Sequence, residues 1–187
     1  MSSKVLTLAF LRPAQDDPWV NRLTAMASAH GFCHVELVFD SHLNSKVVSA
    51  PCFSIYAGGT ANIHRKAFSN PNYEFISLLV SPQQYETCFS FCNDVSKSNM
   101  TFDERGMWFS QFHPGCYHVD SISVGATFCS KIITEALKIA HVQGVDHLCP
   151  SAVTPSRLYN TLYQQETRTS SVIRMRGAYS SLDTNMR

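Results

Sequence analysis

Short apolar runs alternate with polar segments along the whole chain, and their spacing predicts both strands and helices. Unbroken runs rich in valine, isoleucine, leucine and phenylalanine, bounded by polar or turn-forming residues, are typical of buried strands. Five segments have this character: 5–11, 33–39, 46–50, 53–56 and 73–80. The segments 46–50 and 53–56 are short and lie on either side of Pro51, so they are expected to form two separate strands.

Apolar residues three and four positions apart predict four helices. Three of the helix starts carry a capping residue followed by proline, at Asp17-Pro18, Ser81-Pro82 and Thr154-Pro155. Ser81-Pro82 is also followed by a glutamine at the third position, which completes a capping box. The helices are expected to begin at Pro18, Pro82, Cys129 and Pro155, with Gly31 and Gly144 ending the first and third. In residues 98–126 the apolar residues recur with neither the strand period nor the helix period, which indicates a long ordered loop.

Composition narrows the class of protein. The chain has 187 residues, of which 44% are hydrophobic and 16% charged, which suits one domain with a real core and excludes a disordered chain. We expect this domain to span residues 1–163, followed by a polar tail at 164–187. The net charge of +1 indicates neither a nucleic-acid nor an anionic-membrane partner.

The apolar run at 5–11 also bears on localisation. It could pass for a short signal segment, but the residues after it contain no small-residue cleavage site, so a buried strand is the better interpretation. No run is long enough to span a membrane. A cytoplasmic protein with reduced cysteines is therefore expected.

Seven cysteines invite the question whether one of them is reactive. Cys88 and Cys92 are four residues apart among apolar neighbours, as expected of buried thiols on one helix. The histidines and cysteine of the segment 113–118 match no standard zinc spacing, so neither a metal nor a cofactor is predicted. Cys129 differs, because it falls in the first turn of a helix, where free N–H groups and the helix dipole lower a thiol pKa. His34, at the start of a strand, is the candidate base for that thiol.

Five segments in a fixed order resemble a known family. They read FCHVELVF, KVVSA, YEFISLLVSPQQYETCFSFCNDV followed by FD, TFCSKIITEALKIA and VTPSRLYNTL. Their order and spacing, over roughly residues 30–162, resemble the circularly permuted branch of the NlpC-type papain-like cysteine peptidases. The resemblance implies an α+β, papain-like fold in which an antiparallel sheet packs against helices and the nucleophile lies at a helix N-terminus.

The resemblance also implies site residues. It assigns Cys129 as nucleophile, His34 as general base and Ser49 as the third, orienting residue, where relatives often have glutamate. Glu36 also departs from the family pattern, because relatives usually have a small residue two positions after the histidine. Residues two apart on a strand share a face, so Glu36 is the second candidate for the orienting role. The turn that follows offers His42 and Asn44.

The function implied is that of a cysteine peptidase or amidase that works through a thioester acyl-enzyme, without metal or cofactor. Its substrate would be a protein or peptide, with a ubiquitin-like tag or a viral polyprotein among the candidates. The aromatic residues of the 98–126 segment, Trp108, Phe109, Phe112 and Tyr117, are expected to shape a substrate groove. Two alternatives stay open: a lipid acyltransferase or acyl hydrolase on the same fold, and a catalytically silent binding module.

Overall fold

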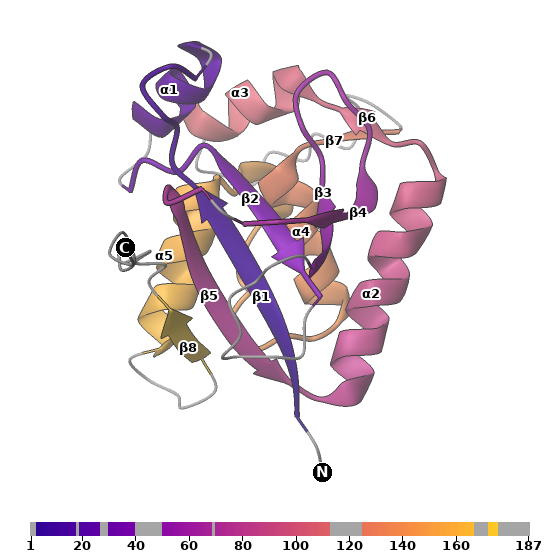
Figure 1. The fold of residues 1–187 in the computed structure, drawn as a ribbon. Coiled ribbons are helices and arrows are strands. Elements are labelled where there is room, and N and C mark those ends of the chain that lie inside the picture. Colours follow the sequence, from indigo (N-terminus) through magenta and orange to yellow (C-terminus); the bar gives the residue numbers. More distant parts are fainter. Residues whose placement is uncertain are drawn as a thin grey trace, which may run out of the picture.

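A six-stranded antiparallel sheet organises the molecule in our computed structural model (Figure 1). The structure describes residues 3–17, 19–26, 30–39, 50–68, 70–112, 125–166 and 172–175. The strand order in the sheet is β4-β3-β2-β1-β5-β8, and every neighbouring pair is antiparallel. The strands of this sheet are β1 (Lys4–Leu11), β2 (His34–Val38), β3 (Ala50–Ser54), β4 (Asn62–Lys66), β5 (Tyr73–Val80) and β8 (Val172–Met175).

Helices cover one face of the sheet. Helices α2, α4 and α5 pack there against the strands, whereas α1 and α3 both lie toward the top of the view in Figure 1, beyond the end of the sheet. The helices are α1 (Trp19–Met26), α2 (Pro82–Lys97), α3 (Glu104–Phe112), α4 (Cys129–Ile139) and α5 (Pro155–Glu166), with a short 3₁₀ turn at Pro150–Ala152. No helix in the described part of the chain is both long and apolar enough to cross a membrane.

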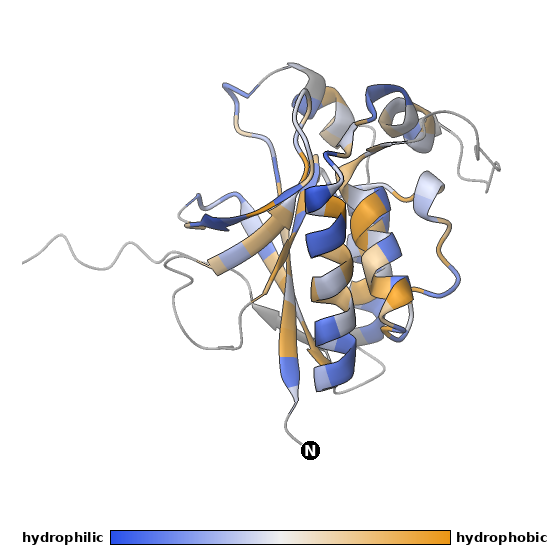
Figure 2. Cartoon of the chain, turned by 90° about the vertical axis from the view of Figure 1, so that its right-hand side faces the viewer, coloured by the Kyte–Doolittle hydropathy of each residue, from blue (hydrophilic) through white to orange (hydrophobic). Residues whose placement is uncertain are grey.

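The main core lies between the sheet and α2, α4 and α5. Strand residues such as Leu8, Val35 and Leu37 meet helix residues such as Cys88 and Ile133 there, all fully buried. In Figure 2 the strands of the sheet are coloured mainly as hydrophobic, and the helices beside them carry both hydrophobic and hydrophilic residues. A smaller cluster lies on the opposite face of the sheet. Because strand residues alternate between the two faces, His34 and Glu36 project to that second face while Val35 and Leu37 project toward α4.

Much of this architecture follows the sequence prediction. The strands at 5–11, 33–39 and 73–80 are confirmed, and so is the α+β class. The capping box at the start of α2 is present in full, since the Gln84 amide donates to Ser81 Oγ (3.1 Å) and Gln84 Oε1 accepts from the Ser81 amide (2.9 Å). Cys88 and Cys92 are buried on this helix.

The separation of two strands at Pro51 is wrong, because Pro51 lies inside β3. Its missing N–H falls outside the two register pairs between β3 and β2, at Phe53 and Cys52, although Pro51 is also the register partner of Arg65 on β4. The Pro51 carbonyl is used, and it accepts from the Phe39 amide at 2.9 Å. Residues 46–49 lie outside the described residues.

The segment 98–126 is more regular than a loop. It contains α3 and a short parallel pair between β6 (Thr101–Phe102) and β7 (Ala126–Thr127), while residues 113–124 lie outside the described residues. Helix α4 ends at Ile139, before Gly144, because His141 already adopts the left-handed conformation (φ 51°) that closes a helix. At the C-terminus, α5 continues to Glu166 and β8 pairs with β5, so these parts of the expected tail belong to the fold.

Candidate active site

Cys129 is the first residue of α4, and its sulfur is held by backbone amides. The residue before it, Phe128, is the N-cap and makes no side-chain cap hydrogen bond, so the first amides of the helix keep their N–H groups available. The amides of Ser130 and of Cys129 itself interact with the thiol, and so does the amide of Val35 on β2. Cys129 is 4% exposed.

A local opening in the sheet lets the thiol reach β2. Strand β3 pairs with β2 only at Leu37 and Val38, so the first residues of β2 lack a β3 partner in the described part of the chain. The Val35 amide instead interacts with the Cys129 sulfur. The thiol therefore lies against β2 at the residue that follows His34.

Burial works against the thiolate at this position. Desolvation raises the pKa of Cys129 to about 11, although the three amides that point at the sulfur lower it, and the nearby Glu36 carboxylate raises it further. The sequence predicted a lowered pKa from the helix N-terminus alone. The amides are present as expected, but in this resting conformation desolvation outweighs them.

His34 is the first residue of β2 and is 7% exposed. Its ring stacks on Tyr56, with ring centroids 4.4 Å apart, and its Nε2 lies 3.6 Å from Glu36 Oε1. Nε2 has no hydrogen-bond partner among the described residues, so it does not hydrogen-bond to the thiol. Burial lowers the pKa of His34 to about 4; the Glu36 charge raises it and the Lys66 charge lowers it further. The imidazole is therefore neutral near pH 7.

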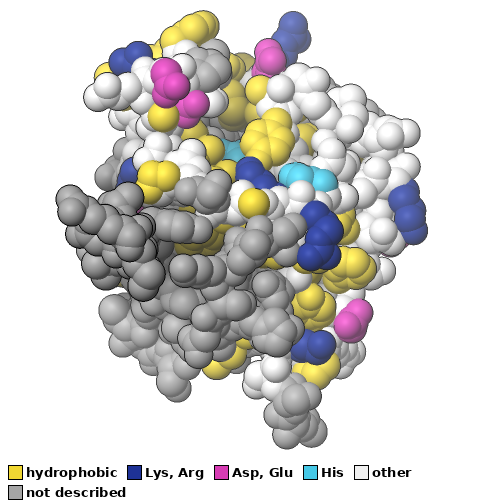
Figure 3. Space-filling model, viewed as in Figure 1, with side chains coloured by type: hydrophobic (Ala, Val, Ile, Leu, Met, Phe, Trp, Pro, Cys, Tyr) yellow, Lys and Arg dark blue, Asp and Glu magenta, His cyan; other side chains and the backbone are white. Residues whose placement is uncertain are grey.

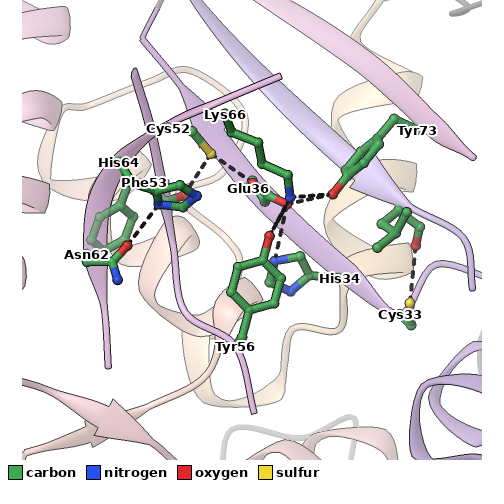
Figure 4. Close-up of polar contacts among 11 residues, drawn as sticks. Cys33, His34, Glu36, Cys52, Phe53, Tyr56, Asn62, His64, Lys66 and Tyr73 are labelled. Carbon is green, nitrogen blue, oxygen red and sulfur yellow. Dashed lines mark hydrogen bonds and ion pairs between the residues drawn. The ribbon is translucent and has the colours of Figure 1, made fainter. Parts of the chain in front are cut away.

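Glu36 is the centre of a buried polar cluster (Figure 4). Its Oε1 accepts from Tyr56 (2.6 Å), Lys66 (2.5 Å) and Tyr73 (2.7 Å), and its Oε2 accepts from the Cys52 thiol (2.8 Å). Burial alone would raise its pKa, but the His34 charge and the hydrogen bonds from Cys52, Lys66 and Tyr56 lower the pKa to about 2. A fully buried carboxylate is thus kept ionised by donors from β3, β4 and β5 and by Tyr56, which follows β3.

Of the residues expected at the site, the structure brings His34 and Glu36 into one cluster and places Cys129 against the same strand. Ser49, His42 and Asn44 lie outside the described residues, as does the segment 113–118 considered for zinc.

Sequence reasoning missed the four donors around Glu36, namely Cys52, Tyr56, Lys66 and Tyr73. Lys66 lies on β4, a strand that the hydrophobic pattern did not reveal. Tyr73 belongs to a predicted strand, but its side chain reaches Glu36 from the far side of β1, and this depends on strand pairing that no local pattern specifies.

Acid should destabilise the protein through His34 in a defined pH window. Folding lowers the pKa of His34 from 6.5 to about 4, so between these values the unfolded chain binds a proton that the folded chain does not. The free energy of unfolding should therefore fall as the pH drops from about 6.5 to 4, by on the order of 3 kcal/mol. Urea denaturation at several pH values between 4 and 6.5 measures this change in the free energy of unfolding.

Glu36 extends the loss of stability to lower pH, because its stabilising contribution is full above pH 4.5 and declines toward about pH 2. His34→Gln should remove most of the slope between pH 4 and 6.5, whereas His147→Gln, at an exposed position, should leave it unchanged. An unaltered slope in the His34 variant would show that another group titrates.

Comparison of the chain with protein-family models, with curated proteins and with solved structures finds no significant match.

Proposed function

We propose that the protein is a cysteine-dependent hydrolase in which Cys129 attacks the carbonyl carbon of an amide or ester. One observation carries the proposal: a buried thiol at a helix N-terminus, in contact with several backbone amides, lies against the strand that bears a histidine–carboxylate pair. A nucleophile, a base and an orienting group on rigid elements are the arrangement that thiol acyl transfer requires.

The protonation states favour a general-base mechanism over a preformed ion pair. With the Cys129 pKa raised and the His34 pKa lowered, both groups are neutral near pH 7. Because Nε2 faces Glu36, we assign Nδ1 as the ring nitrogen that accepts the thiol proton as the sulfur–carbon bond forms. The Glu36 carboxylate stabilises the imidazolium that results. His34 then protonates the leaving group, and afterwards it accepts a proton from the water that hydrolyses the thioester.

The same helix N-terminus would stabilise the tetrahedral intermediate. When the carbonyl π bond opens, its electron pair moves to oxygen, and the amides of Cys129 and Ser130 are placed to donate to this oxyanion. Phe128 has no side-chain oxygen that could compete for these amides. Ser130 anchors the first turn, since its Oγ donates to the Val153 carbonyl at 2.6 Å.

A protein or peptide is the proposed substrate. Helix α3 lies in the segment that leads to Cys129, and its Phe109 is 53% exposed while Trp108 is half-buried. Exposed aromatic surface suits the binding of peptide side chains. An acyl group on Cys129 could equally be passed to an acceptor other than water, as in a lipid acyltransferase.

A second candidate is a catalytically silent binding module. The raised pKa of Cys129 favours this alternative, and so does the orientation of His34 Nε2 toward Glu36 rather than toward the sulfur.

Alkylation by iodoacetamide as a function of pH tests the proposal against the silent module. If His34 accepts the thiol proton, Cys129 should be labelled at a nearly constant rate from about pH 5 to 8. General-base assistance contributes about 10²-fold or more, so His34→Gln should slow labelling at pH 7 by at least that factor. In this variant the rate should instead rise with pH toward the thiol pKa of about 11.

Peptide mapping assigns the label to individual cysteines, and the half-buried Cys149 provides the internal reference. Its rate should be the same in the wild type and in His34→Gln. Identical pH profiles for Cys129 in both proteins would refute the role of His34 and favour the silent module.

A further inference from the structure

Three side chains of types that bind metal ions lie together on the sheet face that carries Glu36. A carboxylate oxygen of Glu36, the sulfur of Cys52 and a ring nitrogen of His64 all lie within 4.8 Å of one another. They come from three adjacent strands, β2, β3 and β4. Cys52 and His64 are direct cross-strand partners, and Cys52 also pairs with Val38, two residues from Glu36. Sheet pairing therefore fixes the three ligands relative to one another.

A neighbouring side chain orients the histidine as in metal centres. Nδ1 of His64 lies 2.8 Å from Asn62 Oδ1 (Figure 4). A carbonyl oxygen can only accept, so Nδ1 carries the proton and Nε2 presents its lone pair. Metal-binding histidines characteristically donate their other ring N–H to such an oxygen, which fixes the tautomer and the ring orientation.

The two oxygens of Glu36 have different partners. The tyrosines and Lys66 all donate to Oε1. Among the described residues, Oε2 accepts only from the Cys52 thiol. Loss of that one proton frees a thiolate and a carboxylate oxygen side by side, and Lys66 keeps its place on Oε1.

We propose that Glu36, Cys52 and His64 bind a zinc ion, with water as the fourth ligand. Thiolate sulfur, imidazole nitrogen and carboxylate oxygen together are a typical zinc donor set, with bonds of about 2.0–2.3 Å. In a tetrahedron these bonds place ligand atoms about 3.3–3.8 Å apart, so the Cys52 sulfur and Glu36 Oε2, now 2.8 Å apart, must separate slightly, and the His64 nitrogen must lie at the same spacing from both. Binding releases the Cys52 proton to solvent and involves no redox step.

Two further features fit a bound ion with a water ligand. His34 Nε2 is buried, lacks a hydrogen-bond partner among the described residues and lies 3.6 Å from Glu36 Oε1, so its N–H can donate to a metal-bound water or hydroxide. The site is also reachable from solvent, because His64 is half-buried and Figure 3 shows histidine side chains at the surface of this face beside lysine and arginine.

Titration of the chelator-treated full-length chain with Co²⁺ tests the site. We expect one ion per chain, a near-ultraviolet band from thiolate-to-cobalt charge transfer, d–d bands of tetrahedral intensity and displacement by Zn²⁺. Calorimetry in buffers of different ionisation enthalpy should show release of about one proton per zinc ion. Asn62→Ala should weaken binding about 10- to 100-fold, the usual effect of losing such an orienting group.

Matched variants identify the ligands. Cys52→Ser should abolish the charge-transfer band, and His64→Gln should weaken zinc binding at least 100-fold, whereas Cys149→Ser and His147→Gln should bind as the wild type does. Because Cys52 is buried, circular dichroism checks its variant, and the half-buried His64 provides a test that leaves the core intact. A band that persists in Cys52→Ser, or zinc affinity unchanged in His64→Gln, would overturn the proposal. Cys129→Ala should bind zinc as the wild type does. Failure of the zinc proposal and failure of the hydrolase proposal are therefore distinguishable.

Discussion

Replacement of Cys129 by serine is expected to abolish hydrolysis, with a loss of at least about 10³-fold in kcat. A serine hydroxyl is far less acidic than a thiol, and a His34 imidazole whose pKa is lowered to about 4 is too weak a base to activate it. The effect can be measured with p-nitrophenyl acetate. The wild type should show a burst of one nitrophenolate per chain followed by slower turnover, and Cys129→Ser should show neither.

Cys149→Ser is the matched control, since it removes a more exposed thiol that is not part of α4. It should retain both the burst and the turnover. If Cys129→Ser retains the burst while keeping the circular dichroism spectrum of the folded protein, the nucleophile has been misassigned.

Replacement of Glu36 by alanine is expected to produce the largest loss of stability, about 3–5 kcal/mol. The change leaves the Lys66 ammonium and the hydroxyls of Tyr56 and Tyr73 without the acceptor that they now share. Removing one partner of a buried charge pair costs more than the pair itself contributes, because the other charge stays desolvated. Urea denaturation at pH 7 measures the difference.

Glu86→Ala, at an exposed position on α2, provides the control and should change stability by less than about 0.5 kcal/mol. Glu36→Gln keeps the shape and one acceptor oxygen, so it should lie between the wild type and Glu36→Ala. A loss below about 1 kcal/mol for Glu36→Ala would mean that the cluster rearranges easily and that Glu36 does not hold His34 in place.

The strands and helices whose apolar residues recur with a strand or a helix period were predictable from the sequence. β1, β2 and β5 each have one or both faces in the core, so their apolar runs stand out, and α2 and α4 carry apolar stripes against the sheet. The cap of α2 followed from three residues, Ser81, Pro82 and Gln84, because capping depends only on near neighbours.

The parts of the fold and of the site that depend on the pairing of distant strands were not predictable from the sequence. β4 reads NIHRK and lies at the edge of the sheet, where half-exposed polar residues leave no alternation to detect. The Glu36 cluster arises because that edge strand brings Lys66 next to β2 and because Tyr73 comes from β5. The sequence suggested Glu36 only as the second choice for orienting the histidine, since nothing local indicates how many donors would surround it.

The direction of the Cys129 pKa shift also could not be predicted from the sequence. Position at a helix N-terminus correctly predicted that backbone amides would interact with the sulfur. It could not predict the degree of burial, which depends on how α4 packs against β2, and burial decides the direction of the shift. A base that accepts the proton during attack is therefore central to the hydrolase proposal.

Mass spectrometry of the intact protein during reaction with p-nitrophenyl acetate tests that proposal most directly. We predict a single acetyl adduct that forms within the burst, maps to Cys129, and disappears by hydrolysis at the steady-state rate. Its formation at pH 7 should depend on His34. Acetylation spread over several cysteines, or an adduct on Cys129 that forms equally fast in His34→Gln, would contradict the proposal.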